Sequence, residues 1–233
     1  MKIGGIQKTS LIDYPGKVSC VLFLAGCNFN CPYCHNPELV RGKNGRPAID
    51  PDQLTAFLLK RRRFLEGVVI TGGEPTLHAD LPELCRRIKQ MGFSVKLDTN
   101  GSHPAMIKQL ITDQLIDFVA MDIKTDPDRY DPLICRTCEP SDIIVAVQSI
   151  LDSQLPHEFR TTCVLPIVDQ AAIEVMAELI HGATRHALQR VQHESVNVLC
   201  PEFFKTRDWY INDAVMTHYQ SVMAAHVGTC VIR

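Results

Sequence analysis

The sequence predicts an α/β protein in which helices cover a parallel sheet. Short runs of apolar and β-branched residues alternate with longer stretches whose apolar residues recur at helical spacing. This alternation repeats about six times, and successive β-α units of that kind build parallel sheets. Polar motifs directly follow several of the expected strands. Such a sheet can be open and doubly wound, or it can close into a full or partial barrel.

The expected strands are short and strongly apolar. The first is the run KVSCVLFLA at residues 17–25, whose continuous apolar character is typical of a buried strand. The second is the β-branched run GVVIT at residues 67–71. The others are expected at residues 93–98, 118–123, 159–165, 195–200 and 228–232.

Six helices are expected between and after these strands. Asp50 and Pro51 mark the clearest start, because an N-cap residue precedes proline at the first helical position. The most regular helix has apolar residues at the i, i+3, i+4 and i+7 positions, namely Leu81, Leu84, Cys85 and Ile88. The remaining helices are expected at residues 104–115, 143–151, 172–179 and 209–225.

The composition is that of an ordinary globular chain, with 233 residues of which 45 % are hydrophobic and 21 % charged. Because no linker or repeat divides the sequence, we expect one domain over residues 1–233. The net charge of −2 gives no argument for nucleic acid or membrane as a partner. No apolar run approaches the roughly 20 residues of a membrane span, and the start lacks the pattern of a secretory signal, so we expect a cytoplasmic protein.

Three cysteines, Cys27, Cys31 and Cys34, follow the first expected strand with the spacing C-x3-C-x2-C. The chain has ten cysteines, and clustered cysteines in a compartment that disfavours disulfides indicate metal or redox chemistry. Thiolates at this spacing bind zinc or an iron–sulfur cluster. His35 could complete a zinc site, but adjacent residues rarely turn both side chains onto one ion. A cubane-type cluster with one iron left open fits three thiolates better.

This motif, with Tyr33 before its last cysteine, resembles the signature of radical S-adenosylmethionine (SAM) enzymes. The run YCHNPE and the opening TSLIDYPGKVSCVLFLAGCNFNCPYC are similar to activases of glycyl-radical enzymes, above all to those of anaerobic ribonucleoside-triphosphate reductase. The resemblance covers residues 5 to 165 well. It implies a [4Fe–4S] cluster on Cys27, Cys31 and Cys34, in a loop at residues 26–37, with SAM on the open iron. It also implies a partial (β/α)6 TIM-type barrel with parallel strands and outer helices.

Gly72, Gly73 and Glu74 directly follow the second expected strand. Two glycines permit a close backbone approach to a ligand, and the carboxylate could receive an ammonium. Taken alone, this motif is more often an ordinary turn between a strand and a helix. Because it comes after the cysteine cluster, the resemblance implies that it binds the methionyl amino group of SAM.

Two further motifs end the third and fourth expected strands. Asp98, Thr99 and Asn100 could form a simple turn or helix cap. Asp122 and Lys124 lie two residues apart on a strand and therefore on one face, where an exposed ion pair would be ordinary. The resemblance implies instead that both motifs contact SAM, the second one through its ribose and carboxylate.

The position of these motifs favours a barrel over an open sheet. In a barrel the carboxyl ends of all strands converge on one mouth, where ligands bind. In an open sheet the ligand groups gather at a switch point between two strands. Four successive strand ends carry polar motifs here, and the open side of a partial barrel could admit a loop of another protein.

The resemblance implies reductive cleavage of SAM to a 5′-deoxyadenosyl radical that generates a glycyl radical on a partner enzyme. The first candidate partner is anaerobic ribonucleoside-triphosphate reductase, with reduced flavodoxin or ferredoxin as electron donor, and no catalytic residue is expected beyond the cluster. One alternative is a radical SAM enzyme that acts on a small molecule, such as a deazapurine-type synthase. Another is a non-enzymatic iron–sulfur or zinc module.

Some features stand outside this interpretation. Cys135 and Cys138 form a C-x2-C pair, either part of an auxiliary cluster, with Cys163 and Cys200 as remote candidates, or two free or redox-active thiols. Related activases use a late histidine, whereas residues 198–202 read VLCPE. The basic run at residues 60–63 is interpreted as the solvated end of a helix that could dock an acidic partner. Residues 160–162 are expected to face the site.

Overall fold

The computed structural model describes residues 1–41, 49–130, 134–135, 138–191, 197–206 and 208–233. One eight-stranded sheet follows the order of the chain from β1 to β8. β1 pairs antiparallel with β2, and every later pair of neighbours is parallel. The strands are β1 Ile3–Ser10, β2 Ser19–Leu24, β3 Gly67–Gly72, β4 Ser94–Thr99, β5 Phe118–Asp122, β6 His157–Cys163, β7 His186–Arg190 and β8 Cys230–Ile232.

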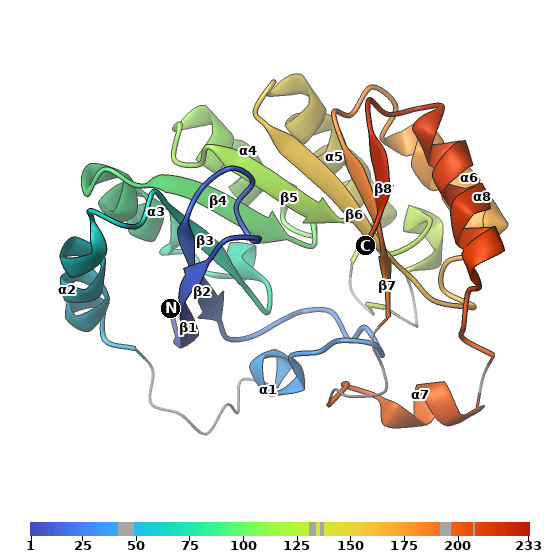
Figure 1. Ribbon diagram of the computed structural model, residues 1–233, viewed down its shortest axis with the longest axis horizontal. Coiled ribbons are helices and arrows are strands. Elements are labelled where there is room, and N and C mark those ends of the chain that lie inside the picture. Colours follow the sequence, from blue (N-terminus) through green and yellow to red (C-terminus); the bar gives the residue numbers. More distant parts are fainter. Residues whose placement is uncertain (42–48, 131–133, 136–137, 192–196, 207) are drawn as a thin grey trace.

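The helices that connect the parallel strands lie along the outer side of the curved sheet (Figure 1). They are α2 Pro51–Arg61, α3 Leu81–Gln90, α4 Pro104–Thr112, α5 Pro140–Asp152, α6 Gln170–Leu179 and α8 Asp213–Ala224. The connections between successive parallel strands are right-handed in nearly all proteins. When the strands also follow the order of the chain, all the connecting helices lie on the same face of the sheet. An open doubly wound sheet would reverse its order at a switch point. The order therefore confirms the barrel, which stays partial because β1 and β8 are the edges of the sheet.

Short elements lie where the parallel strands end. α1 Pro37–Val40 and α7 Pro201–Thr206 lie below the sheet in Figure 1, and the 3-10 turns η1 Pro75–Leu77 and η2 Pro127–Arg129 follow β3 and β5. The segment before α7 runs against the cysteine loop, because the backbone N–H groups of Leu199 and Cys200 donate to the carbonyls of Cys34 and Pro32 at 3.0 and 3.1 Å. Among the described residues no helix has the length and apolar character needed to cross a membrane.

The main core lies between the sheet and the outer helices. Side chains on the outer face of the strands are fully buried there, for example Leu22, Ile70 and Leu97. A smaller cluster lies inside the curve of the sheet and consists of Tyr14, Val21 and Val69, with Phe23 and Phe118 packed against it. Burial of large apolar side chains is the main stabilising contribution to such a fold.

Six of the seven expected strands are confirmed, and the six expected helices correspond to α2, α3, α4, α5, α6 and α8. The strand expected at residues 195–200 is wrong. Residues 197–200 are not in a strand, and residues 195–196 lie outside the described residues. The strand in this part of the chain is β7, whose sequence HALQR has no β-branched residue and ends in two polar ones. Sequence analysis also missed β1, because IGGIQKTS has two glycines and a mostly polar second half.

Two neighbouring leucines of α2 allow a matched test of this packing. Leu58 is fully buried, whereas the side chain of Leu59 is 50 % exposed. We expect Leu58→Ala to lower the free energy of unfolding by about 2–5 kcal/mol, because it leaves a cavity in the core. Leu59→Ala should change it by less than about 0.5 kcal/mol. Urea unfolding measures both, and equal losses would contradict the burial described here.

Candidate active site

The carboxyl ends of the central strands open into a pocket of about 220 Å³. Its wall contains every residue that the sequence placed at the cluster or at SAM. These residues are Cys27, Cys31, Tyr33, Cys34, Gly72, Gly73, Glu74, Asp98, Thr99, Asn100, Asp122 and Lys124. The topology thus brings motifs from four different strand ends to one mouth, as a barrel does.

The cysteine loop begins where β2 ends. Gly26 has a φ of +97°, a value that favours glycine, and turns the chain out of the strand. Cys31 is buried, whereas Cys27 and Cys34 are half-buried. Burial raises the pKa of the Cys27 thiol to about 12 and that of the Cys31 thiol to about 11. The thiolates that a metal needs are therefore costly here unless a cation compensates their charge.

The two glycines after β3 are required because the chain passes directly against the cysteine loop. A Cβ atom on Gly73 would lie 1.9 Å from the carbonyl oxygen of Gly26. A Cβ atom on Gly72, whose φ is +126°, would lie 2.3 Å from the backbone nitrogen of Leu24. The close approach lets the N–H groups of Gly73 and Glu74 donate to the carbonyls of Leu24 and Gly26, both at 2.8 Å.

The carboxylate of Glu74 is almost fully buried, at 1 % exposure, and joins β3 to β4. Its Oε1 accepts hydrogen bonds from the N–H and hydroxyl of Thr76, at 3.0 and 2.5 Å, and from the Thr99 hydroxyl at 2.7 Å. Its Oε2 accepts one, from the Asn100 N–H at 2.7 Å. Burial raises the pKa of Glu74, and these hydrogen bonds act in the opposite direction. Oε2, with a single donor, retains the capacity to accept another from a ligand.

Asn100 connects β4 to the cysteine loop. Its side-chain amide donates to the Asn28 side chain at 3.0 Å, and the Asn28 amide donates to the Ser102 hydroxyl at 2.9 Å. The Ser102 hydroxyl donates back to Asn100 at 2.6 Å. Asn28 follows Cys27, so this network fixes the position of the cysteine loop relative to the sheet. Asn28 was not singled out from the sequence, because a loop asparagine is ordinary.

Charged side chains at β4, β5 and β6 form a network beside the pocket, and three of them, Asp98, Asp122 and Lys124, line it. Arg160 contacts both carboxylates, with Nε 2.8 Å from Asp122 and Nη1 3.2 Å from Asp98. Lys124 lies 3.1 Å from Asp122, and Lys96 pairs with Asp98. The Asp122–Lys124 pair exists, but it is not a solvent-exposed one, because the two side chains are 25 % and 13 % exposed. Burial alone would raise the pKa of Asp122, but the charges of Arg160 and Lys124 outweigh it and hold that pKa well below its ordinary value.

The pocket also contains residues that sequence analysis did not assign to the site. Phe29 and Val40 supply apolar wall. Phe29 lies in the cysteine loop and Val40 at the end of the short helix α1, and a single apolar residue of this kind resembles any core residue, so neither gave a signal. Of residues 160–162, which are expected from the sequence to face the site, Thr162 lines the pocket, whereas Arg160 and Thr161 do not. His35 and Asn36 of the cysteine motif line the pocket as well, and burial lowers the pKa of His35.

No disulfide bond joins any of the described cysteines. Cys135 lies under the cysteine loop and donates from Sγ to the Asn28 carbonyl at 3.4 Å. Cys163 is buried in β6, and Cys200 is exposed. In the part of the chain that the structure describes, no three His, Cys, Asp or Glu side chains surround a single metal ion.

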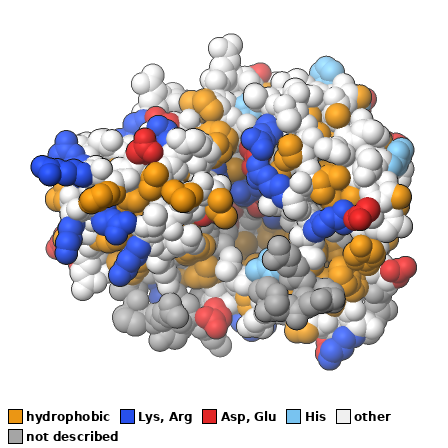
Figure 2. All heavy atoms as spheres, in the orientation of Figure 1, with side chains coloured by type: hydrophobic (Ala, Val, Ile, Leu, Met, Phe, Trp, Pro, Cys, Tyr) orange, Lys and Arg blue, Asp and Glu red, His pale blue; other side chains and the backbone are white. Residues whose placement is uncertain are grey.

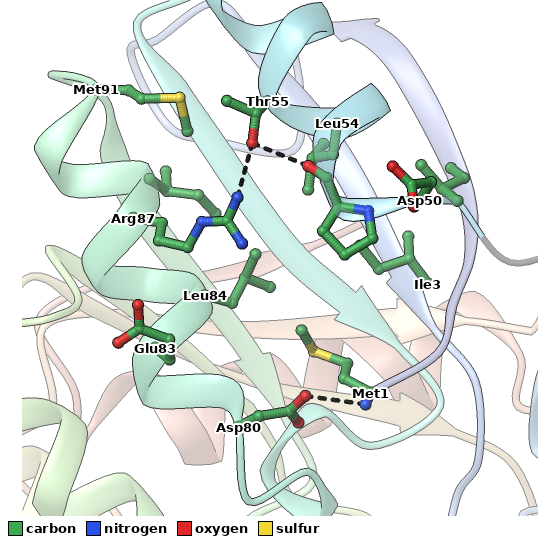
Figure 3. A pocket seen from close by; sticks show the side chains of 13 residues that line it. Met1, Ile3, Asp50, Leu54, Thr55, Asp80, Glu83, Leu84, Arg87 and Met91 are labelled. Atoms are coloured by element: carbon green, nitrogen blue, oxygen red, sulfur yellow. Dashed lines mark hydrogen bonds and ion pairs between the residues drawn. The ribbon is translucent and has the colours of Figure 1, made fainter.

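A second cavity, of about 370 Å³, lies between β1, α2 and α3 and is unrelated to these motifs (Figure 3). Its walls are mainly apolar, with Ile3, Leu54 and Leu84 among them. Asp80 binds the amino group of Met1 at 2.9 Å at one end, and Arg87 donates to the Thr55 hydroxyl at 3.0 Å at the other. None of the residues that the sequence placed at the cluster or at SAM lines this cavity.

The pocket at the strand ends fits an iron–sulfur cluster with a small polar ligand beside it. Three thiols supply the ligands that such clusters use. The Tyr33 hydroxyl is buried in the wall beside the Cys31 thiol, and its hydrogen bond to that thiol partly offsets the effect of burial on the pKa of Cys31.

The charge network predicts a pH dependence of stability. Because the pKa of Asp122 is lower in the folded protein than its ordinary value of 3.8, its ionised form contributes stability that is complete above that value and lost as the pH falls. Between about pH 6 and pH 3, the free energy of unfolding should therefore fall less steeply for Asp122→Asn than for wild type. Urea unfolding measures this, with the exposed Asp113→Asn as control. Parallel curves for Asp122→Asn and wild type would contradict the prediction.

Comparisons with known proteins identify the family. A profile of the Radical SAM superfamily matches residues 21–180. A Methanocaldococcus jannaschii protein named as a glycyl-radical enzyme activating enzyme is 39 % identical over 197 residues, which are 82 % of this chain and 80 % of that protein. The pyruvate formate-lyase-activating enzyme of Clostridium pasteurianum is 30 % identical over 135 residues, 55 % of each chain.

Solved structures agree on the fold. A radical SAM methyltransferase from Sphaerobacter thermophilus has a TM-score of 0.65 at 15 % identity, covering 97 % of this chain and 68 % of that one. SuiB of Streptococcus suis also has a TM-score of 0.65, at 11 % sequence identity. The match covers 91 % of this chain and 48 % of SuiB, so this chain spans about half the length of SuiB. The profile match and the Methanocaldococcus relative show that this chain belongs to the radical SAM superfamily, among the glycyl-radical enzyme activating enzymes, which use a [4Fe–4S] cluster and SAM.

Proposed function

We propose that the pocket at the strand ends holds both cofactors within a single domain over residues 1–233. Cys27, Cys31 and Cys34 would be the cluster ligands. The SAM contacts would be Tyr33, Gly72, Gly73, Glu74, Asp98, Thr99, Asn100, Asp122 and Lys124. The observation that carries this proposal is that one wall contains three thiols, the close-packed glycines and the charged side chains of Asp98, Asp122 and Lys124.

The polar groups of the pocket suit the amino-acid end of SAM. Oε2 of Glu74 accepts one hydrogen bond from the chain and can accept another from an ammonium. Lys124 has three N–H donors and one carboxylate partner, Asp122, so it can also meet a carboxylate of the ligand. The Tyr33 hydroxyl adds a donor beside the thiols.

When bound, the cluster and SAM would supply a one-electron reductive cleavage that gives methionine and a 5′-deoxyadenosyl radical, which takes a hydrogen atom from a glycine of the partner. The chain's own contribution is to position these groups and to keep water away from them. The apolar walls at Phe29 and Val40 serve the second purpose.

The partner that we propose is anaerobic ribonucleoside-triphosphate reductase, with reduced flavodoxin or ferredoxin as electron donor. The support is the resemblance of YCHNPE and of the opening segment to activases of that reductase. Pyruvate formate-lyase is the alternative partner, because the Clostridium relative is named for it.

Cys31→Ala should abolish both cluster binding and SAM cleavage, because two remaining thiolates do not hold the cluster. We expect loss of iron and sulfide from the anaerobically purified protein, and no methionine or 5′-deoxyadenosine with dithionite and SAM. The exposed Cys200→Ser should behave like wild type. SAM cleavage retained by Cys31→Ala would refute the ligand assignment, and zinc without sulfide in wild type would refute the cluster.

The partner is tested by electron paramagnetic resonance. Mixing the reduced protein, SAM and anaerobic ribonucleoside-triphosphate reductase should give a glycyl radical signal on the reductase. The signal should disappear when the radical-bearing glycine of the reductase is changed to alanine. A signal with pyruvate formate-lyase alone would replace the proposed partner, and no signal with either would favour a small-molecule substrate.

A further inference from the structure

The pocket at the strand ends, which we call the cofactor pocket, does not explain a surface beside the β1–β2 hairpin. It consists of Lys8, Leu11, Ile12, Lys17 and residues 59–64, and we call it the hairpin face. Its Ile12, Leu11 and Phe64 side chains are 88 %, 74 % and 71 % exposed, the highest values among the large hydrophobic side chains of the described chain. Single exposed apolar residues are ordinary, whereas a group of them marks an interaction site.

The two segments of the hairpin face lie at the same end of the sheet, where β2 and β3 begin, which is opposite to the end that carries the pocket. Ser19 of β2 pairs with Ser10 of β1 on one side and with Gly67 of β3 on the other. The hairpin tip and the turn after α2 are therefore only about two strand spacings, or ~10 Å, apart where they leave the sheet. Arg61 links them directly, because its Nη2 donates to the Thr9 hydroxyl at 2.7 Å.

The hairpin face is strongly basic. It holds Lys8, Lys17 and the four cations of residues 60–63, six of the 24 Lys and Arg residues of a chain whose net charge is −2. None of the six forms an ion pair within the described residues. Two acids lie beside them, Asp13, which accepts from the Ser10 hydroxyl, and Glu66, which accepts from the Val18 N–H, so cations outnumber acids by six to two. Figure 2 shows hydrophobic atoms across the left part of the molecule, with Lys and Arg side chains beside them.

The tip of the hairpin also borders the concave side of the barrel. Ile12 and Asp13 line a cavity of about 460 Å³ whose far wall includes Arg160 and Arg233. Arg160 in turn contacts Asp98, which lines the cofactor pocket. A protein seated on the hairpin face would therefore lie next to a hollow whose wall contacts the wall of the pocket at the strand ends through the Arg160–Asp98 ion pair.

We propose that the hairpin face is the docking surface for an acidic, partly apolar surface of the partner enzyme. This proposal rests on the proposed function, because it takes the substrate to be a protein. An apolar centre at Leu11, Ile12 and Phe64 with a cationic margin is the composition of a specific interface. Opposite charges across it speed encounter and suppress wrong partners.

The experiment compares surface variants in the activation of anaerobic ribonucleoside-triphosphate reductase. Arg63→Glu and Ile12→Ser should each raise, by roughly tenfold, the reductase concentration needed for half-maximal glycyl radical. Both should leave partner-free SAM cleavage with dithionite unchanged, because neither residue lines the cofactor pocket. The matched controls Lys108→Glu, at an exposed cation of α4, and Val175→Ser, at a partly exposed valine of α6, should behave like wild type.

Salt separates the electrostatic part of the effect. Added salt should weaken wild-type activation more than that of Arg63→Glu, because the variant has lost part of the attraction. If the hairpin-face variants activate the reductase like wild type, the docking proposal is wrong, whereas the proposed function is unaffected. Wild type that activates no glycyl-radical enzyme would overturn the proposed function first, and this proposal with it. If Arg63→Glu and Ile12→Ser bind anionic phospholipid vesicles less well than wild type but activate the reductase equally well, the hairpin face would be assigned to a membrane instead.

Discussion

The buried carboxylate of Glu74 is the interaction on which the geometry of the cofactor pocket depends. It takes donors from η1 and from the end of β4, so it holds two strand ends at a fixed distance. Leaving one of these buried donors unpaired would cost about 1–3 kcal/mol. Through Asn100 the same arrangement reaches Asn28, next to Cys27, which we propose as a cluster ligand. The cysteine loop and the Gly-Gly-Glu turn are therefore positioned as one unit, which the backbone contact of Gly73 with Gly26 reinforces.

The charge network acts beside this unit. Three cations, Lys96, Lys124 and Arg160, face two carboxylates, Asp98 and Asp122. Burying an uncompensated charge is unfavourable, and the charge of an ionised Cys31 thiol, which acts on Lys124, can balance the remaining positive charge. Arg160 cross-links β4, β5 and β6 by contacting both carboxylates, which makes the wall rigid before any ligand arrives.

The sequence was informative where chemistry requires fixed spacing. The three cysteines, the Gly-Gly-Glu turn and the Asp-x-Lys pair could be found because each motif is contiguous, and one strand end suffices to position it. Arg160 was only expected to face the site, because its bridge to Asp98 and Asp122 depends on the pairing of three strands. The single apolar residues Phe29 and Val40 carry no pattern of their own. β7 escaped prediction for a related reason: its buried residues His186, Ala187 and Leu188 are stabilised by packing rather than by strand propensity.

The incomplete closure of the barrel fits a protein substrate better than a small one. The small cluster of Tyr14, Val21 and Val69 fills part of the concave side with apolar side chains. The pocket lies at the carboxyl end of the strands. Between the unpaired edges β1 and β8 the concave side is lined by charged groups such as Glu158 and Arg233 rather than by an apolar pocket for a small molecule. A small substrate would be held by enclosure. An extended segment of another protein can instead be held by contacts outside the barrel, and its reactive glycine then needs only to reach the cofactor pocket.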